Sequence, residues 1–110
     1  MGGIESNTSD PITSSLLESD PDCVDIVGKY VSFLPGRLEK IYLVIVEDDI
    51  TEFKDLIHDL KGVSGGMGYP QVSDLCQTIE IALQDNDMKL VLDKIHELEN
   101  LKNRIEAGFR

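Results

Sequence analysis

Apolar residues recur at intervals of three and four along most of this chain, which is the spacing of one face of an α-helix. The clearest stripe follows Asp48-Asp49, either of which can cap a helix. Its apolar members are Ile50, Phe53, Leu56, Ile57, Leu60, Val63 and Met67. A second stripe follows Tyr69-Pro70 and consists of Val72, Leu75, Cys76, Ile79, Ala82 and Leu83. A third follows the turn at residues 85–87, ends at Gly108, and consists of Val91, Leu92, Ile95, Leu98, Leu101 and Ile105.

The first half of the chain predicts two further helical stretches, with an apparent break at Pro35-Gly36 between them. The first opens at Asp20-Pro21, where aspartate can cap and proline suits the first helical position. Its apolar members are Val24, Val27, Val31 and Leu34, and those after the break are Leu38, Ile41, Tyr42, Ile45 and Val46. The β-branched content of residues 42–46 alone would suit a strand, but the spacing on both sides favours helix.

The predicted fold is all-α. Short connections make neighbouring helices antiparallel, so we expect an up-down antiparallel four-helix bundle with a short additional N-terminal helix. That short helix follows Pro11, and Leu16 and Leu17 dock on the body. The small polar residues at the start predict a flexible tail or linker over residues 1–10, ahead of one domain over residues 11–110.

The charge of the chain restricts its partners. Ten Lys and Arg against 21 Asp and Glu leave a net charge of −11, which opposes binding to nucleic acid or to an anionic membrane surface. We therefore expect protein partners and, because no wide apolar surface stripe is evident, a monomer. No run of about 18 apolar residues and no signal peptide is found, which suits a cytoplasmic domain. Cys23 and Cys76 match no zinc spacing.

His58 is the main candidate for chemistry. The apolar stripe of its helix points roughly 200° away from it, so its side chain is expected to face solvent. A lone histidine is more often an ordinary surface residue, but Gly62 lies on the same stripe, where glycine costs about 1 kcal/mol relative to alanine. Such a glycine indicates close approach of another backbone. The residues expected around the imidazole are Lys54, Asp55, Lys61, Gly62 and Gly65.

Lys61 lies three residues from His58, so its ammonium can reach a group carried on the imidazole. Two unit charges about 4 Å apart attract by about 1 kcal/mol in water and about 4 kcal/mol at an effective dielectric constant of 20. The site is exposed, so the lower value applies. We expect Lys61 to tune the chemistry of His58 without being indispensable.

The run His58-Asp59-Leu60-Lys61-Gly62, with Gly68 beyond it, resembles the H-x-L-K-G-x-x-x-x-x-G signature of histidine-containing phosphotransfer (HPt) domains. Leu75-Cys76 and Ile79-Glu80 resemble the L-C-x-x-L-E segment of the same family, and the likeness covers about residues 20–105. It implies a helical bundle in which His58 accepts phosphate, Lys61 lies beside the phosphoryl group and Gly62 provides clearance.

The resemblance also implies a role for Glu80, which matches a position where the family often has Glu or Gln bonded to the imidazole Nδ1. The sequence alone leaves two interpretations open, a solvated glutamate or one facing the groove beside His58. Gly65-Gly66 and Tyr69 depart from the family pattern. We expect Tyr69, with Lys54, Asp55 and Gly65, to contact the partner.

The partners implied by the resemblance are a response-regulator receiver domain and a sensor or hybrid histidine kinase. Phosphate would pass between His58 and receiver aspartates, with Mg²⁺ on the receiver and no cofactor in this chain. The sequence has no G-x-x-x-x-G-K-[ST] loop, so we expect no ATP binding and no autokinase activity. The domain is expected in the cytoplasm, either alone or as the cytoplasmic part of a membrane-bound hybrid kinase.

Two alternatives stay open. The same face could dock a receiver domain without becoming phosphorylated, although an intact His58 argues against this. The pairs Asp55-x-x-His58 and Asp93-x-x-His96 each place a carboxylate and an imidazole on one helix face, as in metal-binding bundles. Here the apolar stripes point both histidines outward, so a metal site is the less favoured alternative.

Overall fold

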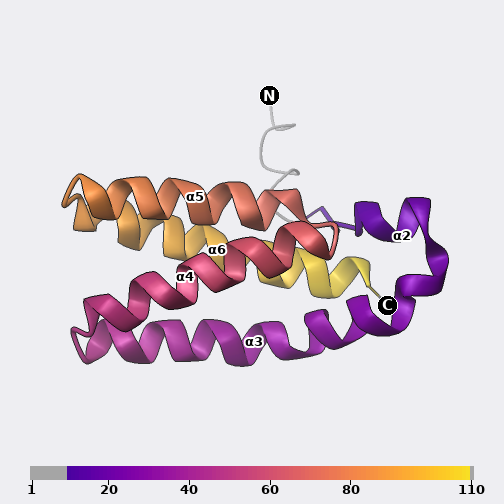
Figure 1. Cartoon of the computed structure of the whole chain (residues 1–110), viewed down its shortest axis with the longest axis horizontal. Coiled ribbons are helices and arrows are strands. Elements are labelled where there is room, and N and C mark those ends of the chain that lie inside the picture. The colour runs from indigo at the N-terminus through magenta and orange to yellow at the C-terminus, as the bar shows by residue number, and fades with distance from the viewer. Residues whose placement is uncertain (1–9, 110) are drawn as a thin grey trace.

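The computed structural model describes residues 10–109, and every regular element in this range is helical. The long helices α3 (Val24–Val46), α4 (Ile50–Gly66), α5 (Pro70–Gln84) and α6 (Met88–Gly108) run alternately up and down as an antiparallel bundle (Figure 1). The short helix α2 (Ser15–Ser19) and the 3-10 turn η1 (Pro21–Cys23) precede them. The predicted all-α bundle is confirmed. The tail expected over residues 1–10 lies outside the described residues except for Asp10.

Helix α3 is continuous through Pro35, where the sequence predicted a break. Proline removes one backbone hydrogen bond and costs a helix interior about 3 kcal/mol or more. Beyond Pro35, however, Leu38, Ile41 and Val44 continue the buried stripe. Each fully buried aliphatic side chain contributes about 1.5–3 kcal/mol, so burial of the three exceeds the cost of the proline. The tertiary contacts therefore carry the helix across this position.

The turns before α4 and α6 lie where the sequence predicted a cap at Asp48-Asp49 and a turn at residues 85–87. The Asp49 side chain accepts a hydrogen bond from Glu52 N at 3.1 Å and caps α4, and the Asp87 side chain caps α6 in the same way through Leu90 N. Left-handed backbone precedes each cap, at Asp48 (φ 59°) and Asn86 (φ 55°). Because of these turns, the α3–α4 and α5–α6 connections lie at one end of the bundle and the α4–α5 turn lies at the other (Figure 1).

The core is formed by the inward stripes of the four long helices. The core residues of α4 include Phe53, Ile57 and Leu60, all at most 1% exposed. Five predicted stripe members are exposed and lie outside it: Val24 (48%), Tyr42 (37%), Val46 (82%), Ile50 (36%) and Leu92 (45%). Val24 and Val46 are the end residues of α3, where neighbouring helices no longer cover the stripe. No helix within residues 10–109 is long and apolar enough to cross a membrane.

The segment before α3 closes the end of the bundle where α4 meets α5. Ser14 Oγ donates a hydrogen bond to Met67 O at 2.7 Å, and Ser15 N donates to Gly68 O at 2.8 Å. Gly68 has φ +87°, and a Cβ there would collide with Leu16 N and Ser14 Oγ. Leu16 and Leu17 are half-buried, so the predicted docking of this short helix is confirmed. These contacts anchor the C-terminal end of α4.

Candidate functional site

His58 lies in the middle of α4 on the side opposite the core. Its neighbours Ile57 and Leu60 are buried, whereas 72% of the His58 side chain is exposed. The outward direction predicted from the apolar stripe is therefore observed. An imidazole this exposed is accessible to another macromolecule.

Glu80 reaches the imidazole from the neighbouring helix α5. Its Oε2 atom lies 3.3 Å from His58 Nδ1, and its Oε1 atom lies 2.6 Å from Lys61 Nζ. The Glu80 side chain is 25% exposed, so it lies in the groove between α4 and α5 and not in bulk solvent. One carboxylate thus links the histidine and the lysine. Of the two interpretations of Glu80 that the sequence left open, the groove position is the one observed.

The charge on Glu80 is stabilised in this groove. The hydrogen bond from Lys61 lowers the pKa of the carboxyl group, and the bond from His58 lowers it further, while partial burial opposes both. Glu80 is consequently an anion at neutral pH, ready to accept a hydrogen bond from Nδ1–H of a neutral imidazole. The adjacent Cys76 thiol is buried, which raises its pKa to about 12, so it is no nucleophile at neutral pH.

A cavity of about 370 Å³ lies beside the imidazole. Its walls come from α4 and α5, and the lining residues are Lys54, His58, Lys61, Glu80, Leu83 and Gln84. From the sequence, Leu83 was predicted only as a member of an apolar stripe, and Gln84 was not predicted to lie near the site. The available signal was helical spacing, because Gln84 lies four residues after Glu80 and therefore on the same side of α5.

The two glycines near His58 are not required by the packing of the described residues. A Cβ at Gly62 would have no atom within 4 Å, and one at Gly65 would be 3.6 Å from Ser73 Oγ, an ordinary contact. Both positions are exposed. The fold therefore has room for an alanine at each, and the open space above Gly62 is free for a group from outside the chain.

Tyr69 corrects one prediction. It was expected to contact the partner, but it is fully buried, and its ring stacks on Tyr30 with the centroids 5.4 Å apart. The residue occupies the N-cap position of α5, and there the ring turns into the core. Lys54 and Asp55 are both exposed, but only Lys54 lines the cavity beside His58.

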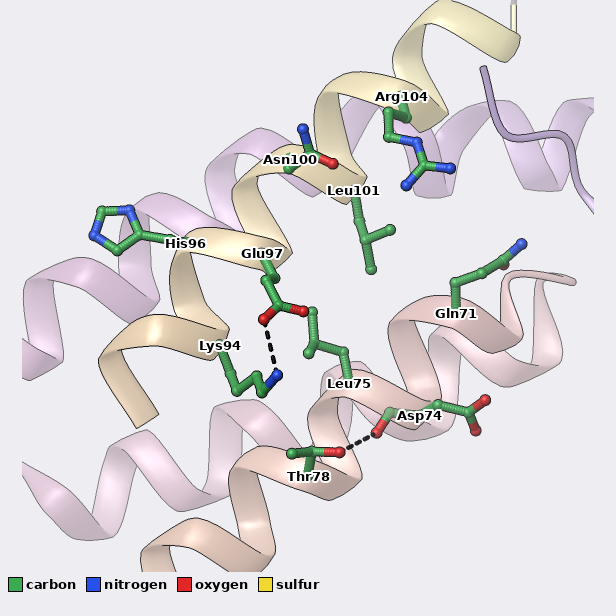
Figure 2. Close-up of a pocket in the computed structure, with 10 residues that line it drawn as sticks. All are labelled: Gln71, Asp74, Leu75, Thr78, Lys94, His96, Glu97, Asn100, Leu101 and Arg104. Atoms are coloured by element: carbon green, nitrogen blue, oxygen red, sulfur yellow. Dashed lines mark hydrogen bonds and ion pairs between the residues drawn. The ribbon is translucent and has the colours of Figure 1, made fainter. Parts of the chain in front are cut away.

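A second hollow, of about 730 Å³, lies between α5 and α6 (Figure 2). Its charged groups include the ion pair between Lys94 and Glu97, 2.8 Å apart, and its apolar lining residues are Leu75 and Leu101. The His96 ring is directed away from these two leucines (Figure 2). Within residues 10–109, no three His, Cys, Asp or Glu side chains are grouped closely enough to hold a metal ion.

Comparison with known protein families gives a match that covers most of the chain. A family model described as Hpt domain matches residues 25–108. No curated protein and no solved structure gives a significant match. The matched range covers most of α3 and all of α4, α5 and α6, and so includes the cluster of His58, Lys61 and Glu80.

Proposed function

This chain belongs to the Hpt domain family, and on that premise we propose that it is a phosphohistidine carrier. The family takes part in phosphotransfer in two-component systems. In our proposal, His58 receives a phosphoryl group from an aspartate of one response-regulator receiver domain and passes it to another. The observation that carries the proposal is the 72% exposed imidazole whose Nδ1 lies 3.3 Å from Glu80.

The transfer step follows from the orientation of the ring. Neutral His58 donates its Nδ1–H to Glu80, which leaves the Nε2 lone pair free to attack phosphorus. The Nε2–P bond forms as the bond from phosphorus to the aspartyl oxygen breaks, and the electron pair leaves on that carboxylate. Nδ1 keeps its proton throughout, so the step needs no separate base. Transfer to the next aspartate is the reverse of this step.

Glu80 and Lys61 each offset one of the two charges that are present once His58 is phosphorylated. A phosphorylated ring that retains Nδ1–H is cationic, and the Glu80 carboxylate beside Nδ1 offsets this charge. Lys61 lies on the same side of α4 and offsets negative charge on the phosphoryl oxygens. Gly62 leaves room for the partner backbone to approach. Lys54, Asp55 and Gly65 lie on the face that the receiver would cover.

The partner supplies what this chain lacks. We propose that Mg²⁺ is bound by the receiver domain, where it offsets charge on the transferring group. The phosphate originates from a sensor or hybrid histidine kinase, since the sequence contains no phosphate-binding loop of its own. We propose a cytoplasmic monomer, either free-standing or attached to a hybrid kinase. The net charge of −11 supports a protein partner over nucleic acid.

The test is transfer from labelled, phosphorylated receiver domains in the presence of Mg²⁺. We expect acid-labile label on the parent and no label on His58→Gln, because the glutamine amide has no nucleophilic lone pair. His96→Gln is the matched control, since it removes the other exposed histidine, and it should accept label like the parent. Equal labelling of His58→Gln would contradict the proposal. Receiver binding without any label would support the docking alternative instead.

A further inference from the structure

The two lysines beside His58 are in different electrostatic situations. Lys61 Nζ is bonded to Glu80 at 2.6 Å, so its charge is already offset. Lys54 lines the same cavity and has no ion pair or hydrogen-bond partner for its side chain among residues 10–109. We propose that Lys54 binds the phosphoryl group directly, as the uncommitted cation of the site. This inference rests on the proposed function and assigns a further residue to it.

The helix geometry brings Lys54 to the reacting group. Lys54 lies four residues before His58, so the two occupy the same face of α4 one turn apart. Side chains in a helix lean toward its N-terminus, and the imidazole therefore leans over the turn that holds Lys54. Because Nδ1 faces Glu80 on α5, Nε2 lies on the other side of the largely exposed ring. The flexible Lys54 side chain, one turn away on the same face of α4, is long enough to bring its ammonium to a phosphoryl group there.

The wall of the cavity opposite Lys54 contains no acid. Because α4 and α5 are antiparallel, Gln84, one turn after Glu80, lies level with Lys54, one turn before His58. Leu83 and Gln84 complete the lining there, and Glu80 is the only carboxylate among the lining residues. Asp55, although close in sequence and exposed, does not line the cavity. An anion entering beside Gln84 thus meets a cation and an amide.

The charge balance gives Lys54 a specific role. With Glu80 ionised, the cavity carries two lysines and one carboxylate, a local excess of one positive charge in a chain of net charge −11. A phosphoryl group brings a charge of about −1.5 to −2 at neutral pH. Lys61 divides its charge between Glu80 and the phosphoryl oxygens, whereas the charge of Lys54 is shared with no carboxylate that lines the cavity.

The test uses phosphoramidate, a small phosphodonor with no surface that could dock on the domain. We expect Lys54→Gln to slow the formation of acid-labile phosphohistidine about fivefold. This is the rate change that corresponds to the loss of one solvent-exposed contact between opposite charges. Lys54→Arg, which keeps the charge, should react at a rate close to the parent. Lys29→Gln is the matched control, because Lys29 is exposed on α3 and its side chain has no partner in the described part of the chain.

The salt dependence of the rate difference between Lys54→Gln and the parent is a second test of the charge contact. In 1 M salt the Debye length falls to about 3 Å, so the difference between Lys54→Gln and the parent should shrink. Helical circular dichroism of each variant confirms that the fold is retained. A fivefold difference that Lys54→Arg restores and salt reduces supports a charge contact with the phosphoryl group.

Three results would overturn the assignment. Equal rates for Lys54→Gln and Lys29→Gln would show that Lys54 does not bind the phosphoryl group. A defect seen with a phosphorylated receiver but absent with phosphoramidate would make Lys54 a docking residue only. A parent domain that takes no label from either donor would remove the proposed function as well, and that failure is recognised because it occurs without any change at Lys54.

Discussion

Gly62 and Gly68 belong to the same signature run after His58, yet the structure gives them opposite surroundings. Around Gly62 there is open space, and no described residue would contact a side chain there. Gly68 has φ +87° and is enclosed by Leu16 and Ser14 from the N-terminal segment. One glycine is therefore available to a partner, and the other is required by the fold. A single motif can thus combine a functional position with a structural one.

The largest expected effect is on stability, at Gly68. In Gly68→Ala, the left-handed backbone and the collision with Leu16 and Ser14 should together cost about 2–5 kcal/mol of unfolding free energy. Urea unfolding measures the loss, and phosphotransfer per folded molecule should stay close to that of the parent. A variant that is as stable as the parent would show that the N-terminal segment is not anchored here.

Gly62→Ala should have the opposite effects: a higher unfolding free energy and slower transfer from a receiver domain. Alanine in an open helical position raises the unfolding free energy by about 0.5–1 kcal/mol, because glycine loses more backbone entropy on folding. Transfer from a phosphorylated receiver should slow, since the added methyl group occupies the clearance above α4. Loading by phosphoramidate, which needs no close approach of a partner backbone, is the control and should change little. Destabilisation similar to that of Gly68→Ala would remove the distinction between the two glycines.

The smallest expected effect is that of the Glu80 charge on the unfolding free energy. Glu80 lies on α5 and contacts His58 and Lys61 on α4, so its charge affects the stability of this helix pair as well as the site. The pKa of Glu80 is lowered in the folded state from its ordinary value near 4.5, mainly by Lys61. Its contribution is therefore present above about pH 4.5 and is lost as the pH falls through the lower, folded-state value. Glu80→Gln should lower the unfolding free energy at pH 7 by at most about 1 kcal/mol, as exposed ion pairs do.

The measurement for Glu80 is the difference in unfolding free energy between the parent and Glu80→Gln across pH. This difference should shrink as the pH is lowered from 5 toward 3. The glutamine oxygen can still accept the hydrogen bond from Nδ1–H, so transfer should persist, but more slowly, because no carboxylate then offsets the charge of the phosphorylated ring. A difference that is constant over this pH range would show that the carboxylate charge does not contribute.

Local patterns in the chain were sufficient to predict most of the helices, a cap at Asp48 or Asp49, the turn at residues 85–87 and the outward direction of His58. Each of these depends on residues within a few turns, where spacing and side-chain chemistry decide the outcome. The helix break predicted at Pro35 is wrong because helix propensity reflects only local preferences. The burial that outweighs the free-energy cost of the proline depends on contacts with the other helices. Tyr69 was mispredicted for the same reason, since its neighbour Tyr30 lies on another helix.

Tertiary structure alone decided how the candidate site is assembled. Glu80 is 22 residues from His58 and 19 from Lys61, and no periodicity specifies that one carboxylate would reach both. The same is true of Gly68, whose surroundings come from Ser14 and its neighbours, more than 50 residues earlier. Helical spacing determines which face a side chain occupies, but the register of one helix against the next determines which faces meet. Only the packed bundle fixes that register.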